Sequence, residues 1–310
     1  MKGFVVKNTG SWYVVKTDDG SLVNCKIKGT FRLKGIRTTN PVAVGDNVEV
    51  SVKDGASYIV SIEPRRNYII RRASNLSKES QILAANIDQA LLIVTLKEPL
   101  TSTTFIDRFL ATAEAYNIPV VIVINKVDLL KDVDERDYLE GVKTLYETVG
   151  YEVVVTNAIS GEGLQELRDK LCGKVTLLSG NSGVGKSTII NSVLLGLNLK
   201  TGSVSETHHT GMHTTTFSEM FELPDGGAVV DTPGVKGFGT IDFDRAEVAH
   251  YFKEIFQFSA DCKYNDCTHT HEPGCAVLEA VENHYISRSR YQSYLSILED
   301  GDDDKYRKPY

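Results

Sequence analysis

The chain has 310 residues, of which 41% are hydrophobic and 24% charged, a composition typical of globular proteins with two or three domains. Residues 1–12 lack the continuous apolar core of a signal peptide, and no apolar run approaches membrane-spanning length, so a soluble, cytoplasmic protein is expected. The net charge of −7 is unevenly spread: residues 1–72 hold 13 Lys and Arg against 6 Asp and Glu, whereas the remainder holds 21 against 35. A basic first segment on an acidic body indicates contact with a polyanion at one end.

The first 72 residues have the pattern of short β-strands. Apolar and polar residues alternate over 23–28, 47–52 and 58–63, and apolar runs cover 4–6 and 12–15. About five strands in so short a segment predict a basic, RNA-binding β-barrel of the OB type, although an SH3-like barrel fits the same pattern. Positive charge is concentrated around Tyr68, where an RNA contact and a solvated linker are the two interpretations; the residues are Arg65, Arg66, Arg71 and Arg72.

Residues 73–240 alternate between strand and helix patterns. The predicted strands are 90–95, 120–124 and 153–155, and the predicted helices are 103–116, 134–149 and 163–171. This alternation predicts a parallel sheet with helices on both faces. Residues 241–300 then show apolar-periodic helices, and the charged tail 301–310 is expected to be disordered.

A phosphate-binding loop lies in the second half of the α/β region. An apolar run leads into Gly180-Asn181-Ser182-Gly183-Val184-Gly185-Lys186-Ser187, which fits G-x-x-x-x-G-K-S, and a helix-compatible stretch follows from Thr188. Backbone N–H groups would hold the phosphates, Lys186 would reach the β and γ phosphates, and Ser187 would hold Mg²⁺. A chance match in a chain of this length has odds on the order of 1 in 100.

Two motifs that recognise guanine precede this loop in the chain. Asn125-Lys126-Val127-Asp128 ends a buried strand, where ligands of parallel sheets bind. The carboxylate of Asp128 can accept from N1–H and the 2-amino group of guanine, while the Lys126 stem covers the base and Asn125 ties loops together. Thr156-Asn157-Ala158 follows the next strand and occupies the place of the loop whose backbone meets the guanine O6.

Two switch segments complete the nucleotide site. Asp231-Thr232-Pro233-Gly234 follows a further strand, so that Asp231 would reach Mg²⁺ through water and the Gly234 amide would face the γ-phosphate. Val235 stands where Ras-like enzymes carry a water-orienting Gln, which predicts slow turnover without a partner. In the Thr-rich segment 207–216, Thr215 is the expected Mg²⁺ ligand, with Thr214 or Thr216 as alternatives. His213 is a candidate for orienting the attacking water, and a solvated histidine is the other interpretation.

These elements stand in an unusual order. An ordinary GTPase begins with the phosphate loop and ends with the base-recognition motifs, whereas here the base-recognition motifs come first. The order predicts a circularly permuted P-loop GTPase domain. In this order, the segment after Asp231 connects directly to the C-terminal helices. This connection suggests that GTP sets the position of those helices.

A metal-binding set follows the GTPase motifs. Cys262, Cys267, His269 and Cys275 supply three thiolates and one imidazole within fourteen residues, a closed set suited to structural, tetrahedral Zn²⁺. Reduced thiols inside a cell favour a metal over a disulfide. His271 is the alternative ligand to His269, and Cys25 and Cys172 are expected to be small core residues.

Taken together, the motifs resemble those of the ribosome small subunit-dependent GTPase A family over essentially the whole chain. The resemblance rests on the basic barrel, the permuted order, the phosphate loop, 211–216 (Gly-Met-His-Thr-Thr-Thr), 84–89 (Ala-Ala-Asn-Ile-Asp-Gln) and the Cys/His set. It implies a GTPase that is stimulated by the small ribosomal subunit and acts through rRNA in late maturation of that subunit. Met212 departs from the basic residue that the family often carries there.

Two other function classes fit parts of the chain. An RNA-binding assembly scaffold that uses GTP only as a binding switch would keep the barrel and the Cys/His set without turnover. A zinc-dependent hydrolase would need an open metal position, which a complete Cys₃His set does not leave. One set of each domain makes a monomer the expected state.

Overall fold

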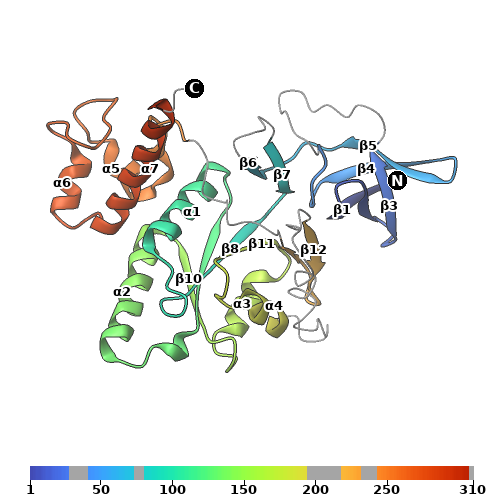
Figure 1. The fold of residues 1–310 in the computed structure, drawn as a ribbon, viewed down its shortest axis with the longest axis horizontal. Coiled ribbons are helices and arrows are strands. Elements are labelled where there is room, and N and C mark those ends of the chain that lie inside the picture. Colours follow the sequence, from blue (N-terminus) through green and yellow to red (C-terminus); the bar gives the residue numbers. More distant parts are fainter. Residues whose placement is uncertain (28–40, 73–79, 194–217, 232–242, 307–310) are drawn as a thin grey trace.

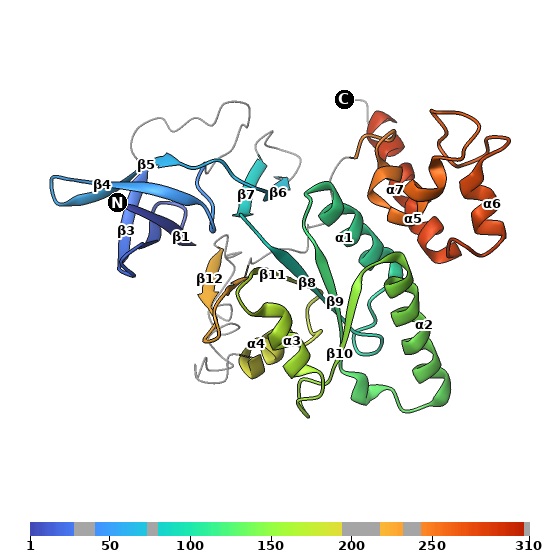
Figure 2. The same ribbon diagram turned by 180° about the vertical axis from the view of Figure 1, so that it is seen from behind.

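The computed structural model describes residues 1–27, 41–72, 80–193, 218–231 and 243–306, and within these ranges three regions lie in a row. Figure 1 places the N-terminal barrel and the C-terminal helices at opposite ends, with the α/β region (the G domain) between them. Figure 2 shows the same order from behind. The nucleotide motifs therefore lie in the central region, which contacts both of the others.

The N-terminal region is a closed five-stranded barrel. Its strands are β1 (Lys2–Asn8), β2 (Tyr13–Thr17), β3 (Leu22–Ile27), β4 (Asn47–Lys53) and β5 (Ala56–Ile62). They pair in the order β1-β2-β3-β5-β4, and β4 returns to β1, with β3 and β5 parallel. Inward-facing Val5, Tyr13, Val15, Cys25 and Ile59 fill the barrel, as the alternation predicts. The predicted OB-type barrel is confirmed.

The G domain contains the predicted parallel sheet. Its parallel strands are β8 (Gln89–Val94), β9 (Val120–Asn125), β10 (Glu152–Thr156), β11 (Val175–Ser179) and β13 (Ala228–Asp231). They lie in the order β10-β9-β8-β11-β13. All six residues of β8 and of β9 are buried, which explains their continuous apolar runs. The carboxyl ends of these five strands therefore share one edge of the sheet.

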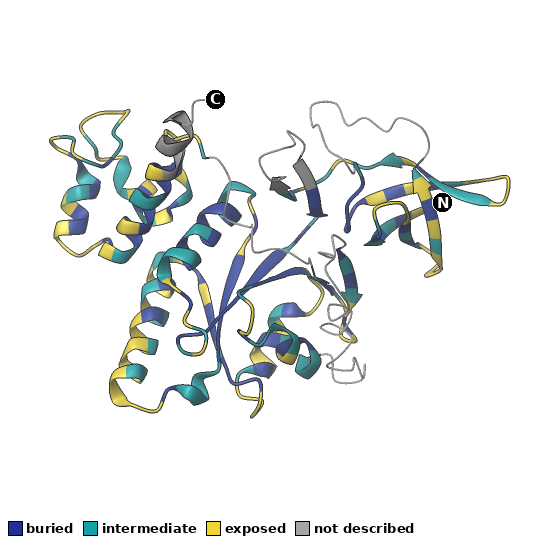
Figure 3. Cartoon of the chain, viewed as in Figure 1, coloured by how far each residue is buried: buried dark blue, intermediate teal, exposed yellow. Residues whose placement is uncertain are grey.

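Helices cover both faces of this sheet. They are α1 (Thr103–Ala115) and α2 (Val133–Val149) on one face, and α3 (Leu164–Leu171) and α4 (Lys186–Val193) on the other. Figure 3 shows the buried strands between half-exposed helices. Ser102 caps α1 by accepting from the Phe105 N–H, and Gly150 ends α2 in a left-handed conformation. Each fully buried Leu or Phe on these faces contributes about 1.5–3 kcal/mol relative to exposure.

The sheet does not stop at the G domain. Strand β12 (Glu219–Glu222) pairs antiparallel with β13 on one side and with β1 of the barrel on the other. Within the described residues the sheet therefore has eleven strands. A separate hairpin of β6 (Tyr68–Arg72) and β7 (Ser80–Ala85) lies across the expected domain boundary at residue 72. The division into domains at 72, 240 and 300 stays a prediction.

The C-terminal region is helical and packs against α1. It contains the 3₁₀ turn η4 (Val248–Tyr251), α5 (Lys253–Ser259), α6 (Ala276–Glu282) and α7 (Arg288–Tyr306), and another short turn, η1 (Val127–Leu129), lies in the G domain. Helix α7 runs on to Tyr306, whereas disorder was expected from residue 301. Tyr294, Ile297 and Leu298 anchor the preceding turns, and extending a helix costs less than starting one. Within the described ranges, no helix has the length and apolarity needed to cross a membrane.

Among the arginines near Tyr68, Arg65 and Arg66 have structural partners. The Arg65 side chain is 8% exposed, and its Nε and Nη2 donate to the two carboxylate oxygens of Asp46 at 2.6 Å each. Arg66 pairs with Asp88 at 2.6 Å. Arg65 therefore fits neither of the two interpretations, an RNA contact or a solvated linker residue, because its charge is paired inside the protein.

Candidate nucleotide site and metal centre

The sequence-predicted nucleotide residues meet at one edge of the parallel sheet. β9 ends at Asn125, β10 at Thr156, β11 at Ser179 and β13 at Asp231, and each strand is followed at once by its motif. Parallel strands place their carboxyl ends together, so the order of the motifs along the chain does not affect the site. The permuted order and an ordinary GTPase site are thus compatible.

The phosphate loop is held tightly between β11 and α4. Gly180 and Gly185 both have positive φ. A Cβ added at Gly180 would lie 2.2 Å from the Ile93 carbonyl oxygen, and a Cβ added at Gly185 would lie 2.4 Å from Asn125 Nδ2. Only glycine fits there. Lys186 Nζ donates to the carbonyl oxygens of Gly180 and Asn181 at 2.8 and 2.7 Å, so the ammonium lies over the loop. Ser182 and Gly183 are exposed, and Val184 is buried.

Asn125 joins the phosphate loop to the base-recognition loop. Its Nδ2 donates to the Val184 carbonyl oxygen at 2.9 Å. Its Oδ1 accepts from Thr156 Oγ1 at 3.1 Å and from the Ala158 N–H at 3.2 Å. Because Asn125 is 3% exposed, these bonds fix the distance between the two loops.

The base-recognition residues leave one acceptor unused. Asp128 Oδ1 is buried and has no hydrogen-bond partner, as expected of a group that awaits the N–H donors of guanine. Lys126 has φ 63°, and its Nζ donates to the Glu98 carbonyl oxygen at 2.8 Å, which extends the side chain across the site. Asn157 Oδ1 accepts from the N–H groups of Ile159 and Ser160 and shapes the loop that carries Ala158.

The loop between β8 and α1 also lies at this site, although no sequence motif marks it. Besides the Glu98 carbonyl that holds Lys126, Pro99 Cδ lies 3.6 Å from where a Cβ would stand at Gly183. The position of the loop could have indicated this role, because the loop follows the carboxyl end of a central parallel strand, where ligands bind.

The Mg²⁺ and switch residues are described only in part. Ser187 and Thr188 lie in the first turn of α4, beside the phosphate loop, and Asp231 lies at the end of β13 opposite Glu219 of β12. Hydroxyl and carboxylate oxygens at these places suit Mg²⁺. Thr215, His213 and Gly234 lie outside the described residues, and their roles stay predictions.

The four predicted metal ligands come together. The ligand atoms of Cys262, Cys267, His269 and Cys275 all lie within 4.8 Å of one another. His269 Nδ1 is 3.5 Å from the sulfurs of Cys262 and Cys275, which are 3.9 Å apart. Zinc–ligand bonds of about 2.0–2.3 Å in a tetrahedral site place the ligand atoms about 3.5–3.8 Å from one another. Three of the four ligand atoms therefore have nearly the spacing of a tetrahedral zinc site, and the set could hold a metal ion.

The surroundings distinguish His269 from His271. His269 is 2% exposed, and burial lowers its pKa, which favours the neutral imidazole that metals bind. His271 is exposed, and its Nδ1 lies 2.8 Å from Thr270 Oγ1. Burial raises the pKa of the Cys267 thiol to about 12, so a metal must displace its proton. Cys25 is a core residue as expected, but Cys172 is exposed because α3 ends there at the surface.

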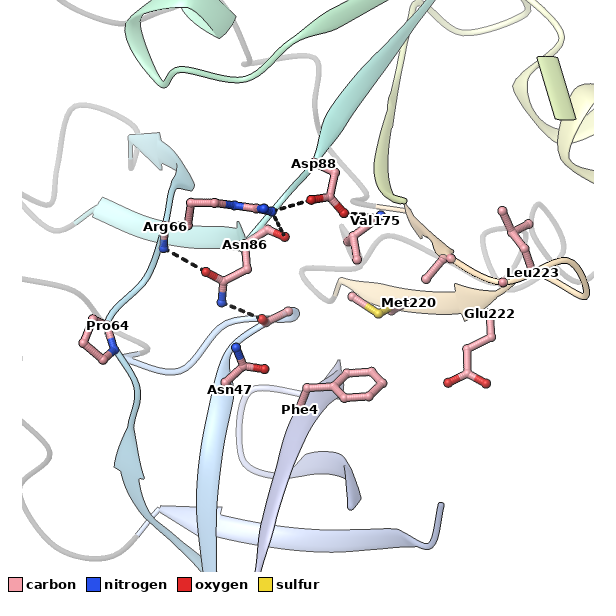
Figure 4. A pocket seen from close by; sticks show the side chains of 14 residues that line it. Phe4, Asn47, Pro64, Arg66, Asn86, Asp88, Val175, Met220, Glu222 and Leu223 are labelled. Atoms are coloured by element: carbon pink, nitrogen blue, oxygen red, sulfur yellow. Dashed lines mark hydrogen bonds and ion pairs between the residues drawn. The ribbon is translucent and has the colours of Figure 1, made fainter. Parts of the chain in front are cut away.

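A second concave feature lies away from the nucleotide motifs. A cavity of about 670 Å³ separates the barrel from the G domain, lined by Phe4 and Asn47 on one side and Met220 on the other (Figure 4). Arg66 pairs with Asp88, and Asn86 Nδ2 donates to the Gly45 carbonyl oxygen at 2.9 Å. The lining includes Val175 and Ala228, where β11 and β13 begin. This cavity is thus at the opposite edge from the nucleotide site.

Comparison with known proteins identifies the family. The family model described as RsgA GTPase matches residues 62–241, and the one described as RsgA N-terminal domain matches residues 2–59. A Bacteroides fragilis protein named small ribosomal subunit biogenesis GTPase RsgA is 62% identical over the full length of both chains. The chain belongs to the RsgA GTPase family. Proteins with the same name from Phocaeicola vulgatus and Porphyromonas gingivalis are 60% and 56% identical, again over the full length of both chains.

Solved structures of similar proteins agree with RsgA membership. YjeQ from Thermotoga maritima is 36% identical, with 99% of each chain covered and a TM-score of 0.78. YloQ, described as a circularly permuted GTPase, is 29% identical, with 100% of this chain and 96% of the other covered and a TM-score of 0.75. The permuted GTPase fold predicted from the motif order is confirmed, and GTP hydrolysis is the activity of this chain.

Proposed function

We propose that this GTPase acts in late maturation of the small ribosomal subunit, which it contacts through rRNA and which stimulates its turnover. The observation that carries the proposal is full-length identity of 62% to a protein named for biogenesis of that subunit, in a chain whose nucleotide motifs converge on one site. A cytoplasmic monomer is the state that we propose for it.

The chemistry follows from the residues at the sheet edge. Lys186 binds the β and γ phosphates, the amides of 180–188 and Gly234 hold their oxygens, and Asn125, Lys126, Asp128, Asn157 and Ala158 select guanine. Ser187, Thr215 and Asp231 would hold Mg²⁺, and the ion would offset the charge that develops on the phosphates. His213 is our candidate for orienting the attacking water, because Val235 cannot do so. Without a water-orienting side chain at position 235, turnover depends on a partner.

The barrel is the proposed RNA-binding region. The Trp12 ring is 44% exposed, and Lys26 Nζ lies 4.4 Å from its centroid. Trp12 lies in the β1–β2 loop, and Lys53 ends β4 beside the β4–β5 loop. OB-type barrels bind nucleic acid with these loops and the face of β2 and β3. An exposed aromatic ring beside a cation suits base stacking together with phosphate contacts.

The metal centre is proposed to be a structural zinc site, one per chain. All four ligand positions are filled by side chains, which leaves no open position for a substrate. Its sulfurs belong to the core of the C-terminal helices: Cys275 is 5% exposed and accepts from the Leu278 N–H at the start of α6. Metal binding would therefore stabilise that core.

The test is GTP turnover by the purified protein with and without small ribosomal subunits. Large subunits and the Lys186→Ala variant are the controls. We expect small subunits alone to raise turnover about tenfold or more, since partner-supplied groups in other GTPases contribute that much or more. Equal turnover with and without either subunit would contradict the proposal. A plain RNA-binding scaffold with vestigial nucleotide binding would instead keep its cellular role in the Lys186→Ala variant.

A further inference from the structure

The surface of the C-terminal helical region is acidic, in contrast to the basic barrel. Residues 243–299 contain nine Asp and Glu against five Lys and Arg. Of the five cations, Arg290 is buried in an ion pair and Lys253 pairs with Glu114 of α1. The other three, Arg245, Lys263 and Arg288, are exposed. The exposed carboxylates are Asp244, Glu247, Asp261, Asp266, Glu279, Glu282 and Glu299. Like charges disfavour contact, so this surface is a poor partner for RNA phosphates.

The same region presents aromatic rings to solvent. Tyr285 is 72% exposed, and its ring stacks on Phe258 of α5 with centroids 6.2 Å apart and an interplanar angle of 27°. Phe256, 52% exposed, lies two residues before Phe258. Exposed aromatic rings of this kind are enriched at protein interfaces, where they supply most of the binding energy.

The backbone holds Tyr285 in its outward position. His284 adopts a left-handed conformation with φ 63°, two residues after α6 ends at Glu282. The N–H groups of Tyr285 and Ile286 both donate to the Ala280 carbonyl oxygen, at 2.8 and 3.1 Å. Ile286 is 1% exposed and anchors the turn in the core. Because the ring is already fixed by this turn and by Phe258, binding a partner would order little further.

Carboxylates flank the stacked rings in the sequence. Asp261 follows Phe258 by three residues, and Glu282 precedes Tyr285 by three, and both are exposed. Aromatic faces attract Lys and Arg through cation–π contacts, and carboxylates bind the same cations. The chemistry that matches this surface is a Lys- and Arg-rich polypeptide.

We propose that Phe258, Tyr285, Asp261 and Glu282 form a docking surface for a basic protein segment of the small ribosomal subunit. The inference rests on the proposed function, because it takes the small subunit as the partner. It divides recognition between the two ends of the molecule. The basic barrel contacts RNA, and the acidic, aromatic surface contacts protein.

The first test identifies the partner molecule directly. A photoreactive phenylalanine derivative is placed at position 285 in the full-length, metal-loaded protein, which is bound to purified small subunits and irradiated. We expect an adduct that survives ribonuclease and is destroyed by protease, with a Lys- and Arg-rich protein attached. An adduct that ribonuclease removes, or no adduct while the protein is bound, overturns the proposal.

The second test measures affinity for purified small subunits by co-sedimentation. Tyr285→Ala is expected to weaken binding about five- to tenfold, as truncation of an interface aromatic does, while Tyr285→Phe retains it. Glu282→Lys should also weaken binding, because it reverses the charge. Tyr138→Ala on α2, where the ring is 47% exposed, is the matched control.

These variants separate the two proposals. Wild-type affinity in both Tyr285→Ala and Glu282→Lys overturns the docking surface and leaves the proposed function standing. Failure of the wild-type protein to bind small subunits at all contradicts the proposed function, and the docking surface with it. Unchanged GTP binding by each variant shows that the G domain is intact.

Discussion

At the residue scale, we propose that guanine selection depends on one carboxylate, that of Asp128. Asp128 Oδ1 is buried without a partner, so a base that offers two N–H donors satisfies it. In Asp128→Asn, the amide offers an acceptor and a donor, and one donor of guanine then faces an N–H group. Hydrogen bonds to charged groups are worth about 1.5–3 kcal/mol each, so GTP affinity should fall on the order of 100-fold. Xanthosine triphosphate, which has a carbonyl at position 2, should bind the variant better than GTP.

Titration with fluorescent GTP and xanthosine triphosphate measures both effects. Asp137→Asn, at an exposed position on α2, is the matched control and should bind GTP as the wild type does. Retained preference for GTP in Asp128→Asn would mean that another group recognises the base.

The metal ligands give a second prediction at this scale. His269→Ala should release the metal, because it removes one of four ligands that lie within 4.8 Å of one another. His271→Ala should retain it, since that imidazole is exposed and lies against Thr270. Metal content per chain after gel filtration, measured by atomic emission, checks both. Loss of metal from His271→Ala alone would reverse the assignment.

Individual residues were predictable from sequence where the chemistry is local. The phosphate loop and the Cys/His set are contiguous, so spacing alone located them. Glu98, whose carbonyl holds Lys126, and Asp46, which binds Arg65, were not found, because each partner lies 19 or more residues away. Such pairs depend on how the strands are arranged.

At the element scale, β12 connects the G domain to the barrel. Lys7 Nζ pairs with Glu219 at 2.9 Å, and the Asn8 N–H donates to the Ser218 carbonyl oxygen at 3.3 Å. Lys7 and Glu219 are each 40% exposed, so the pair is worth about 0.5–1 kcal/mol after solvent screening. Lys7→Glu and Glu219→Lys should each speed amide exchange in β1 and β12, and the double variant should restore protection.

Hydrogen exchange followed by mass spectrometry is the measurement. Lys2→Glu is the matched control. It breaks an exposed ion pair with Glu63, which joins two residues of the barrel region, and should leave amide exchange in β12 unchanged. If the double variant exchanges as fast as the single ones, the charge pair does not hold the barrel on β12.

Elements were predicted well where their pattern is strong. The helices at 103–116 and 134–149 match α1 and α2 within a residue, since each has a long apolar stripe. Strands β6, β7 and β12 were missed. Four residues with two glutamates at the ends, as in β12, carry no clear alternation, and pairing with the barrel stabilises them.

At the scale of the whole molecule, buried charges attach the C-terminal helices to the G domain. Arg290 of α7 is 1% exposed and donates to Asp107 of α1 at 2.8 Å and to both oxygens of Glu254 of α5. Tyr146 of α2 donates to the same Asp107 oxygen at 2.9 Å. Figure 1 shows α1 beside α7. Helix α1 follows the loop that holds Lys126, so the C-terminal helices have a described connection to the nucleotide site.

This cluster predicts a strong dependence on Arg290. In Arg290→Met, Asp107 and Glu254 lose their shared cation, and breaking a buried pair in this way costs about 3–5 kcal/mol. Burial raises the pKa of Asp107, although the Arg290 charge opposes this shift. A carboxyl whose folded-state pKa is raised loses stabilising effect as the pH rises through that pKa. Removing Arg290 raises the pKa of Asp107 further. The loss of folding stability in Arg290→Met, relative to the wild type, should therefore grow as the pH rises.

Urea unfolding of the C-terminal helices at several pH values measures the loss, with GTP affinity as an independent check on the G domain. Asp107→Asn is the informative comparison. It removes one charge, leaves Arg290 paired with Glu254 and keeps an acceptor for Tyr146, so its loss of stability should be smaller. Because Asn does not titrate and the wild-type Asp107 has a raised pKa, this loss should shrink as the pH rises through the pKa of Asp107. Equal losses in the two variants, or a deficit in Arg290→Met that shrinks as the pH rises, would show that packing and not charge holds the two regions together.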